Sequence, residues 1–180
     1  MQAYEEIFNQ RGKSYHLAME KYPHARDAEF HAAAKRLKQL DGSTILDLPA
    51  GGGYLKAHLS TQIHYLAYDF SGEFDDNHSQ IKKCKESKVD LDNESIDEIV
   101  SLAALHHIVE RKAFYSEMNR ILKPNGQLII GDVVLGSKMD PFLNGFLDRW
   151  NSMGHNGNFI KEEDLCEMEE AGFNVSMEVD

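Results

Sequence analysis

Length, composition and charge place the chain among ordinary globular proteins. It has 180 residues, 42% of them hydrophobic and 27% charged, and a domain of this length can bury about 70% of its unfolded surface. The net charge of −11 argues against a nucleic acid as partner, because that partner needs a clustered basic face. The sequence contains neither an export signal nor a long apolar segment, which predicts a cytoplasmic protein without a membrane partner.

The start of the chain predicts helices. Apolar residues at helical spacing indicate two short helices between positions 4 and 22, interrupted near Gly12. A third helix begins at Asp27, which can cap it, and Gly42 closes it just before the first strand. We therefore expect a helical segment ahead of the first strand.

The stretch from Thr44 to Tyr54 predicts a buried strand followed by a glycine loop. β-favouring and aliphatic residues fill positions 44–48, and the loop contains Gly51 and Gly53. A side chain at either glycine would forbid the backbone angles of the turn or hold a ligand away from the main chain. A helix over residues 54–60 would then point its N-terminal amides at that ligand. The pattern predicts a cradle for a nucleotide-type molecule.

A second acid strengthens this interpretation. The strand over residues 64–68 ends in Asp69, 16 residues past Gly53, near the ~20 expected for an acid that binds both ribose hydroxyls. Phe70 could then cover a base. The third glycine of a dinucleotide fingerprint is missing, since Lys56 stands in its place. The glycine pair alone does not distinguish between nucleotide ligands.

The remaining elements follow from periodicity and turn residues. Residues 71–80 are polar, so we expect the helix there to be short or lost. The pattern then predicts strands over 81–84, 96–103 and 127–130, helices over 112–122, from 140 and over 161–171, and a half-buried final strand over 173–179. In the helix that starts at Asp140-Pro141, one apolar side, which includes Trp150, is expected to face the core.

The two cysteines, Cys84 and Cys166, lie far apart and have no Cys-x-x-Cys or Cys/His spacing. Such spacings mark zinc sites and disulfide frameworks. We therefore expect free thiols and no metal site.

In four places along the chain the sequence resembles the class I S-adenosylmethionine-dependent methyltransferases. The run Asp47-Leu48-Pro49-Ala50-Gly51-Gly52-Gly53 matches their first motif, except that Pro49 replaces the first glycine. Asp69-Phe70-Ser71 resembles the acid at the end of their second strand. Residues 95–101 with the His106-His107 pair, and residues 119–130, resemble the fourth and fifth strand regions. The resemblance covers residues 44–133.

The resemblance implies an α/β fold with a doubly wound, mostly parallel, Rossmann-like sheet. It implies one domain over residues 1–180, with an N-terminal helical cap (1–42) over the pocket and a Rossmann-like core (43–180). Members of the family insert a seventh, antiparallel strand beside the fifth, and the sequence lacks it. Natural sheets rarely leave an edge bare. Three interpretations follow: the sequence is a shortened form, the sheet closes with six strands, or a partner covers the edge. We favour the third, as a homodimer through that edge.

The resemblance also implies S-adenosyl-L-methionine as cofactor and assigns site residues. Those expected at the cofactor are Asp47, Ala50, Gly51, Gly53, Asp69, Phe70 and Leu102. His106 and His107 are candidate catalytic residues, since an imidazole can take a proton from the acceptor, although an orienting role competes with this assignment. Tyr4 and Tyr15 are candidate substrate contacts, although aromatic residues at helical spacing are more often core.

The function expected from these residues is transfer of a methyl group to a small-molecule acceptor. Two alternatives remain open. An NAD(P)-dependent oxidoreductase also uses a glycine loop and a ribose acid, and a non-catalytic methyltransferase-like module could keep the fold without the activity.

Overall fold

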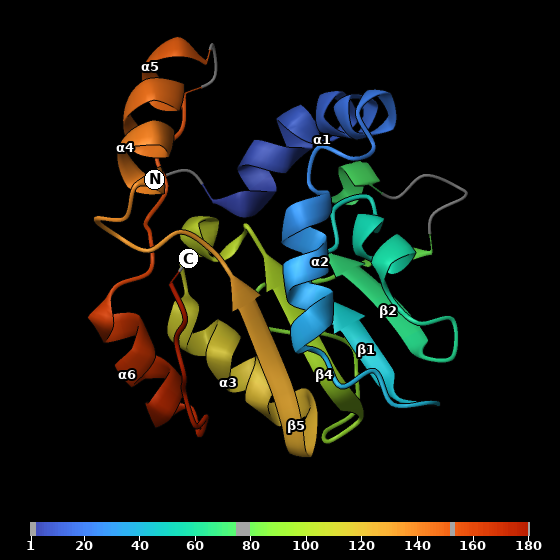
Figure 1. Ribbon diagram of the computed structural model, residues 1–180. Coiled ribbons are helices and arrows are strands. Elements are labelled where there is room, and N and C mark those ends of the chain that lie inside the picture. The colour runs from blue at the N-terminus through green and yellow to red at the C-terminus, as the bar shows by residue number, and fades with distance from the viewer. Residues whose placement is uncertain (1–2, 75–79, 152–153, 180) are drawn as a thin grey trace.

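A parallel five-stranded sheet in the order β3-β2-β1-β4-β5 organises the chain (Figure 1). The computed structural model describes residues 3–74, 80–151 and 154–179. The strands are β1 Thr44–Asp47, β2 His64–Asp69, β3 Ile81–Lys83, β4 Ile96–Leu102 and β5 Leu122–Gly131. The strand order reverses between β1 and β4, and ligands of doubly wound folds bind outside the carboxyl ends of the strands at that point. The predicted Rossmann-like sheet is confirmed.

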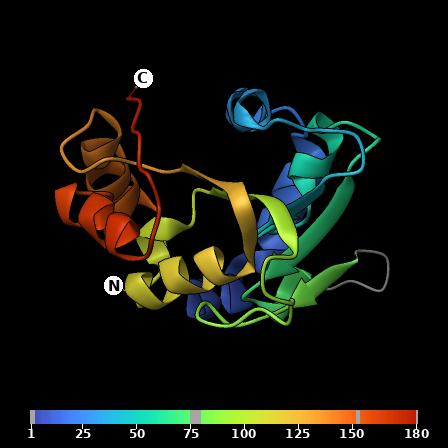
Figure 2. The same ribbon diagram turned by 90° about the horizontal axis from the view of Figure 1, so that it is seen from below.

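Helices cover both faces of the sheet and its carboxyl end. α2 (Asp27–Arg36) and α3 (Arg111–Ile121) lie on opposite faces (Figure 2), so β1 is buried on both sides, with Ile45 and Leu46 fully inaccessible. α1 (Tyr4–Lys21) crosses the carboxyl ends of the strands, and α6 (Glu162–Glu170) packs against α3. α1 therefore covers the end of the sheet at which ligands of doubly wound folds bind.

α1 is one continuous helix, so the predicted interruption near Gly12 is wrong. Gly12 is buried, and a Cβ built on it would lie 2.7 Å from Cβ of Glu73. The glycine therefore permits close packing of the helix against the segment that follows β2. It does not end the helix.

The segments that follow β1 and β2 are shorter than regular helices. The glycine loop opens a 3-10 turn, Tyr54–His58, in place of the expected helix over 54–60. After β2 the chain forms a 3-10 turn over Gly72–Phe74, which agrees with the expected loss of a helix. Positions 75–79 of that polar stretch lie outside the described residues.

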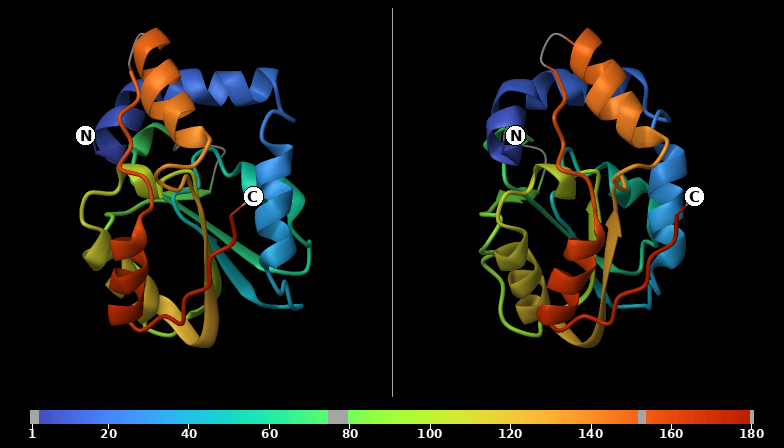
Figure 3. Two further views of the ribbon diagram at one scale, coloured as in Figure 1. Left: turned by 60° about the vertical axis from the view of Figure 1, so that its left-hand side comes forward. Right: turned by 90° about the vertical axis from the view of Figure 1, so that its left-hand side faces the viewer.

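The predicted helix from Asp140 exists, but its apolar side does not face the core. It consists of α4 (Met139–Pro141), a π-helical segment (Phe142–Leu147) and α5 (Asp148–Trp150). The Trp150 side chain is 69% exposed and Phe146 is 55% exposed. The expectation that Trp150 is core is therefore wrong. This helix stands above the sheet beside α1, as both views in Figure 3 show.

The predicted final strand is also wrong. Among the described residues, positions 173–179 pair with no strand and run as an irregular segment (Figure 3). Phe173 and Val175 are half-buried as the alternation predicts, but Val179 is 61% exposed. Glu178 forms an ion pair with Arg36 of α2, which draws the segment across the sheet.

No helix of the described residues combines the length and the apolar character needed to cross a membrane.

Candidate active site

Asp47 ends β1 and is almost completely buried, with 3% of its surface exposed. Oδ2 of its carboxyl accepts a hydrogen bond from the hydroxyl of Tyr65 at 2.6 Å. Burial raises the pKa of Asp47 to about 7; the Tyr65 hydrogen bond opposes this rise, and the charge of Asp69 adds to it. The strand end therefore carries a carboxyl group that changes charge near neutral pH.

Asp69, at the end of β2, holds the glycine loop in place. Its Oδ2 accepts from the Gly51 amide at 2.8 Å and from the Tyr4 hydroxyl at 3.1 Å, and its Oδ1 accepts from the Ser71 amide at 2.8 Å. Burial raises the pKa of this carboxyl to about 6, although these hydrogen bonds oppose the shift. The acid expected at the ribose is thus already engaged by the protein.

A small pocket lies at the carboxyl ends of β1 and β4, beneath α1. Four of the predicted cofactor residues line it, and so do both predicted substrate residues: Asp47, Ala50, Gly51, Leu102, Tyr4 and Tyr15. Its volume is about 40 Å³, room for only a few water molecules at roughly 10–15 Å³ each. Drug-sized ligands need roughly 300–1,000 Å³. In this arrangement α1 closes the pocket.

Three predicted cofactor residues do not line this pocket: Asp69, which is described above, Gly53 and Phe70. Gly53 adopts φ +72° at the start of the 3-10 turn, where a side chain would be strained. Phe70 is 2% exposed and packs edge-on against Tyr4, with ring centroids 5.3 Å apart. Phe70 therefore belongs to the core beneath α1 in this arrangement.

Arg26 is a pocket residue that sequence reasoning missed. Its guanidinium pairs with Glu29 and donates to the hydroxyl of Tyr15. It immediately precedes α2, and nothing in the sequence distinguishes it from the other basic residues near the N-terminus. It places a positive charge in a pocket that also contains Asp47.

The histidine pair lies apart from this pocket, in the 3-10 turn Leu105–His107 that follows β4. Asp132 holds His106 in place: its Oδ1 lies 2.7 Å from Nδ1 of the ring and its Oδ2 accepts from the His106 amide. Burial lowers the pKa of His107 to about 3, and the neighbouring His106 and His155 add to the effect. His107 is therefore neutral at physiological pH.

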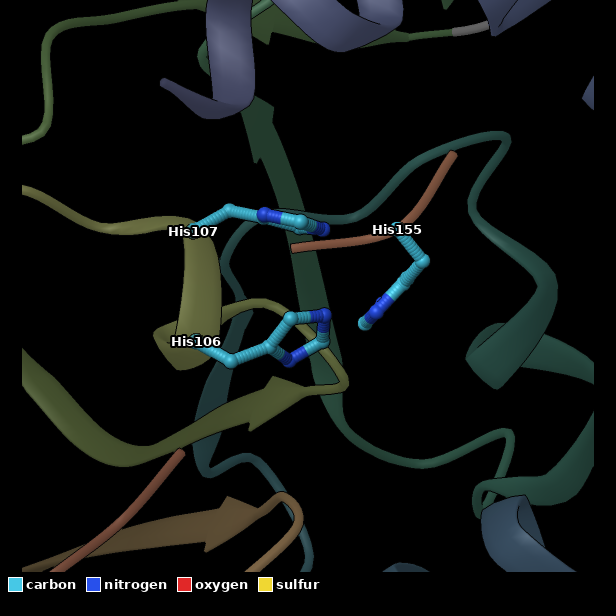
Figure 4. Close-up of side chains that lie close together, drawn as sticks. All are labelled: His106, His107 and His155. Carbon is cyan, nitrogen blue, oxygen red and sulfur yellow. The ribbon is translucent and has the colours of Figure 1, made fainter. Parts of the chain in front are cut away.

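His155 joins this pair from the loop after α5. Its ring centroid lies 5.3 Å from that of His106 and 5.4 Å from that of His107, and Figure 4 shows the three rings turned toward one another. Because His155 and the pair are separated by almost fifty residues, no sequence spacing could have grouped them. The structure thus forms a three-histidine cluster at the carboxyl end of β4.

Comparison with known proteins agrees with this fold. Residues 46–130 match the family described as methyltransferase domain. The curated relatives include the demethylmenaquinone methyltransferase of Clavibacter sepedonicus, 28% identical over 109 residues, and the phthiotriol/phenolphthiotriol dimycocerosates methyltransferase of Mycobacterium leprae (strain TN), 26% identical over 124 residues. These matches cover 55% and 61% of this chain but only 44% of either relative.

Solved methyltransferases share the architecture. A structure from Thermotoga maritima superposes with a TM-score of 0.73 at 22% identity and covers 94% of this chain and 81% of its own. One from Aquifex aeolicus gives 0.64 at 20% identity, with 89% of each chain covered. Residues 46–130 thus match a methyltransferase domain, and the chain shares its fold with these solved S-adenosylmethionine-dependent methyltransferases.

Proposed function

We propose that this chain is an S-adenosylmethionine-dependent methyltransferase that acts on a small-molecule acceptor. The observation that carries the proposal is the 2.8 Å hydrogen bond from the Gly51 amide to Asp69, which joins the glycine loop after β1 to the acid that ends β2. Asp47 lies on the same side of the loop and lines the same pocket as Gly51. A glycine turn between two strand-end acids suits a ligand with both a ribose and an amino acid part.

The residues at this end of the sheet fit S-adenosyl-L-methionine by their chemistry. Asp69 would accept from the ribose hydroxyls, Asp47 would face the ammonium of the methionine part, and Arg26 would face its carboxylate. The bound cofactor would supply a methyl group on a sulfonium centre. The protein then has to hold the acceptor in line with that group, because positioning supplies most of the acceleration in such a displacement.

Access to this site requires α1 to move. The pocket of about 40 Å³ is closed by Tyr4 and Tyr15 of that helix, and Tyr4 occupies an acceptor position on Asp69. A carboxylate offers about four lone-pair positions, so displacement of Tyr4 would free one for a ribose hydroxyl. α1 therefore acts as a cover over the cofactor site.

For the histidine pair we propose an orienting role. A general base works best when its pKa lies near the working pH, and the pKa of about 3 makes His107 too weak for that task. Asp132 fixes the ring of His106 through Nδ1. Both rings are thereby suited to position an acceptor at the end of β4.

A small-molecule acceptor is favoured by two features. The site is covered by α1, and the net charge of −11 disfavours a nucleic acid. Both curated relatives are named for small-molecule acceptors, demethylmenaquinone in one and phthiotriol or phenolphthiotriol dimycocerosates in the other.

Titration calorimetry with S-adenosylhomocysteine and with NAD tests the cofactor. We expect saturable binding of S-adenosylhomocysteine and none of NAD. Binding of NAD alone would favour the oxidoreductase, and binding of neither would favour the non-catalytic module. A screen for methyl transfer over pooled metabolites would then test for a small-molecule acceptor.

A further inference from the structure

The three-histidine cluster offers nitrogen ligands that converge from two separate segments. One ring nitrogen from each of His106, His107 and His155 lies within 4.8 Å of the other two. His106 and His107 come from the turn after β4, whereas His155 comes from the loop after α5, and their rings point toward a shared space (Figure 4). Imidazole nitrogens brought together in this way are the ligands that zinc, copper and nickel prefer.

Two of the rings have the supporting partners that metal-binding histidines require. Nδ1 of His106 lies 2.7 Å from Oδ1 of Asp132, whose side chain is completely buried. Nδ1 of His155 lies 3.0 Å from Oδ1 of Asn144. In metal sites such oxygen partners fix the tautomer and the ring orientation. Each contact leaves Nε2 as the remaining nitrogen for a ligand.

The third ring has an unused nitrogen. His107 is 6% exposed, and its Nδ1 has no hydrogen-bond partner among the described residues. A buried polar atom without a partner costs free energy and requires an explanation. This ring therefore packs against two other imidazoles while its Nδ1 has no hydrogen bond within the described residues.

The loop that carries His155 is built closely around the cluster. A Cβ on Gly157 would lie 2.8 Å from Cδ2 of His106 and 3.2 Å from Cε1 of His155, so the backbone can pass only because this residue is glycine. Asn144 fixes the same loop: its Nδ2 donates to the Gly157 carbonyl and its Oδ1 accepts from the Gly157 amide, at 2.7 and 2.8 Å. The loop therefore packs tightly against the histidine cluster and is held there by the hydrogen bonds to Asn144.

We propose that His106, His107 and His155 form a zinc site with an open fourth position. Three histidines and one exchangeable ligand are a recognised arrangement for zinc, with Zn–N distances of about 2.0–2.1 Å. Tetrahedral ligands at that distance lie roughly 3.4 Å apart, so the cluster must contract slightly on binding. His155 can supply this movement, because it is only half-buried. No metal site was predicted from the sequence, because these three histidines have no ligand spacing along the chain.

The surrounding charges are mixed. Arg11 donates to the Gly154 carbonyl at 3.2 Å and brings a positive charge close to the cluster. Asp132 carries a negative charge on the opposite side, and Asp148 accepts from the His155 amide at 2.8 Å. Arg111 also donates to the Leu105 and Asn158 carbonyls beside the cluster, but its charge is balanced by the ion pair with Asp164. The carboxylates of Asp132 and Asp148 then face the guanidinium of Arg11, and this balance favours a cation.

Calorimetric titration of zinc into the untagged, chelator-treated chain tests the proposal. We expect one zinc per chain and at least a hundredfold weaker binding in His155→Ala, which removes the half-buried ligand and should leave the fold intact by circular dichroism. Asp132→Asn should weaken binding by about tenfold or more, because an outer partner of a ligating histidine is lost.

A matched control is His58→Ala. His58 lies beside His31 and Asp27 on another surface, a group that could bind zinc independently. The proposal requires His58→Ala to bind as the wild type does. Absence of zinc binding by the wild type, or loss of binding in His58→Ala with retention in His155→Ala, would overturn it. Cobalt substitution gives a second readout, since a tetrahedral cobalt spectrum should appear in the wild type and not in His155→Ala.

Discussion

The hydroxyl of Tyr4 donates to Oδ2 of Asp69 across 3.1 Å, so the first turn of α1 is attached to the acid that ends β2. Tyr4 is 3% exposed, and its ring also packs against Phe8 and Phe70. If Asp69 binds a ribose as proposed, the Tyr4 hydroxyl and a ribose hydroxyl would compete for the same carboxylate oxygen. Opening of the site and binding of the cofactor would then be coupled through this hydrogen bond.

Tyr4→Phe should strengthen binding of S-adenosylhomocysteine. The substitution keeps the ring contacts and removes the hydrogen bond that the ligand must displace, which is worth about 1.5–3 kcal/mol to an ionised carboxylate, or roughly tenfold or more in affinity. Calorimetry at pH 8 measures this with Asp69 ionised, since the pKa of Asp69 is about 6. Tyr115→Phe is the control, because it removes a buried hydroxyl that has no partner in the described part of the chain and lies away from the pocket. Equal affinity in Tyr4→Phe and the wild type would mean that Tyr4 does not compete with the ligand.

Asp69→Asn should weaken S-adenosylhomocysteine binding at least tenfold. A charge-assisted hydrogen bond is worth about 1.5–3 kcal/mol, and the amide can accept through only one of its two terminal atoms. The Gly51 and Ser71 amides also depend on this carboxylate, so Asp69→Ala should lose stability as well as affinity. Asp90→Asn, at an exposed acid, is the matched control. If folded Asp69→Asn bound like the wild type, Asp69 would not contact the ligand.

The first two strands and the glycine loop could be predicted because their signals are local. The apolar run of β1, the turn glycines and the strand-end acids Asp47 and Asp69 lie within about 25 residues of one another, and parallel topology brings the carboxyl ends of strands to one edge. The pocket residues Asp47, Ala50 and Gly51 were therefore identified without the structure.

The features that could not be predicted depend on contacts between residues that lie far apart in the sequence. Gly12 looks like a helix breaker until Glu73 is found against it. His155 joins His106 only through a loop held by Asn144. Trp150 lies on an apolar helical stripe that the tertiary fold leaves uncovered. In each case the residue's environment depends on tertiary packing, which the local periodicity of the sequence does not reveal.

The stability of the free protein should fall with rising pH because of Asp47. Its folded pKa of about 7 lies above the unfolded value of about 3.9. The folded state thus binds this proton more tightly, and the stabilisation present below about pH 4 is lost as the pH rises toward 7. Other acids titrate as well, so the informative quantity is the difference between wild type and Asp47→Asn in urea unfolding between pH 4 and 8.

We expect the wild type to lose on the order of a few kcal/mol relative to Asp47→Asn across that range. Asp90→Asn should follow the wild type, because its side chain is exposed. Parallel pH profiles for wild type and Asp47→Asn would show that the Asp47 carboxyl is as solvated in the folded state as in the unfolded one.

The edge of the sheet at β5 predicts self-association. Within the described residues β5 pairs only with β4, and residues 173–179 pass nearby without forming a ladder. The single parallel bridge from Val134 to Ile160 lies beyond the end of the strand. Unpaired backbone groups on an edge strand are a template for another strand. We therefore propose a homodimer in which two copies pair through this edge.

Because a dimer is stabilised by mass action, its thermal midpoint should rise with protein concentration. Light scattering should report twice the monomer mass at high concentration, and the midpoint should fall over a hundredfold dilution. A constant monomer mass with an unshifted midpoint would contradict the dimer. It would leave the segment over residues 173–179, held to α2 through the Arg36–Glu178 ion pair, as the cover of this edge.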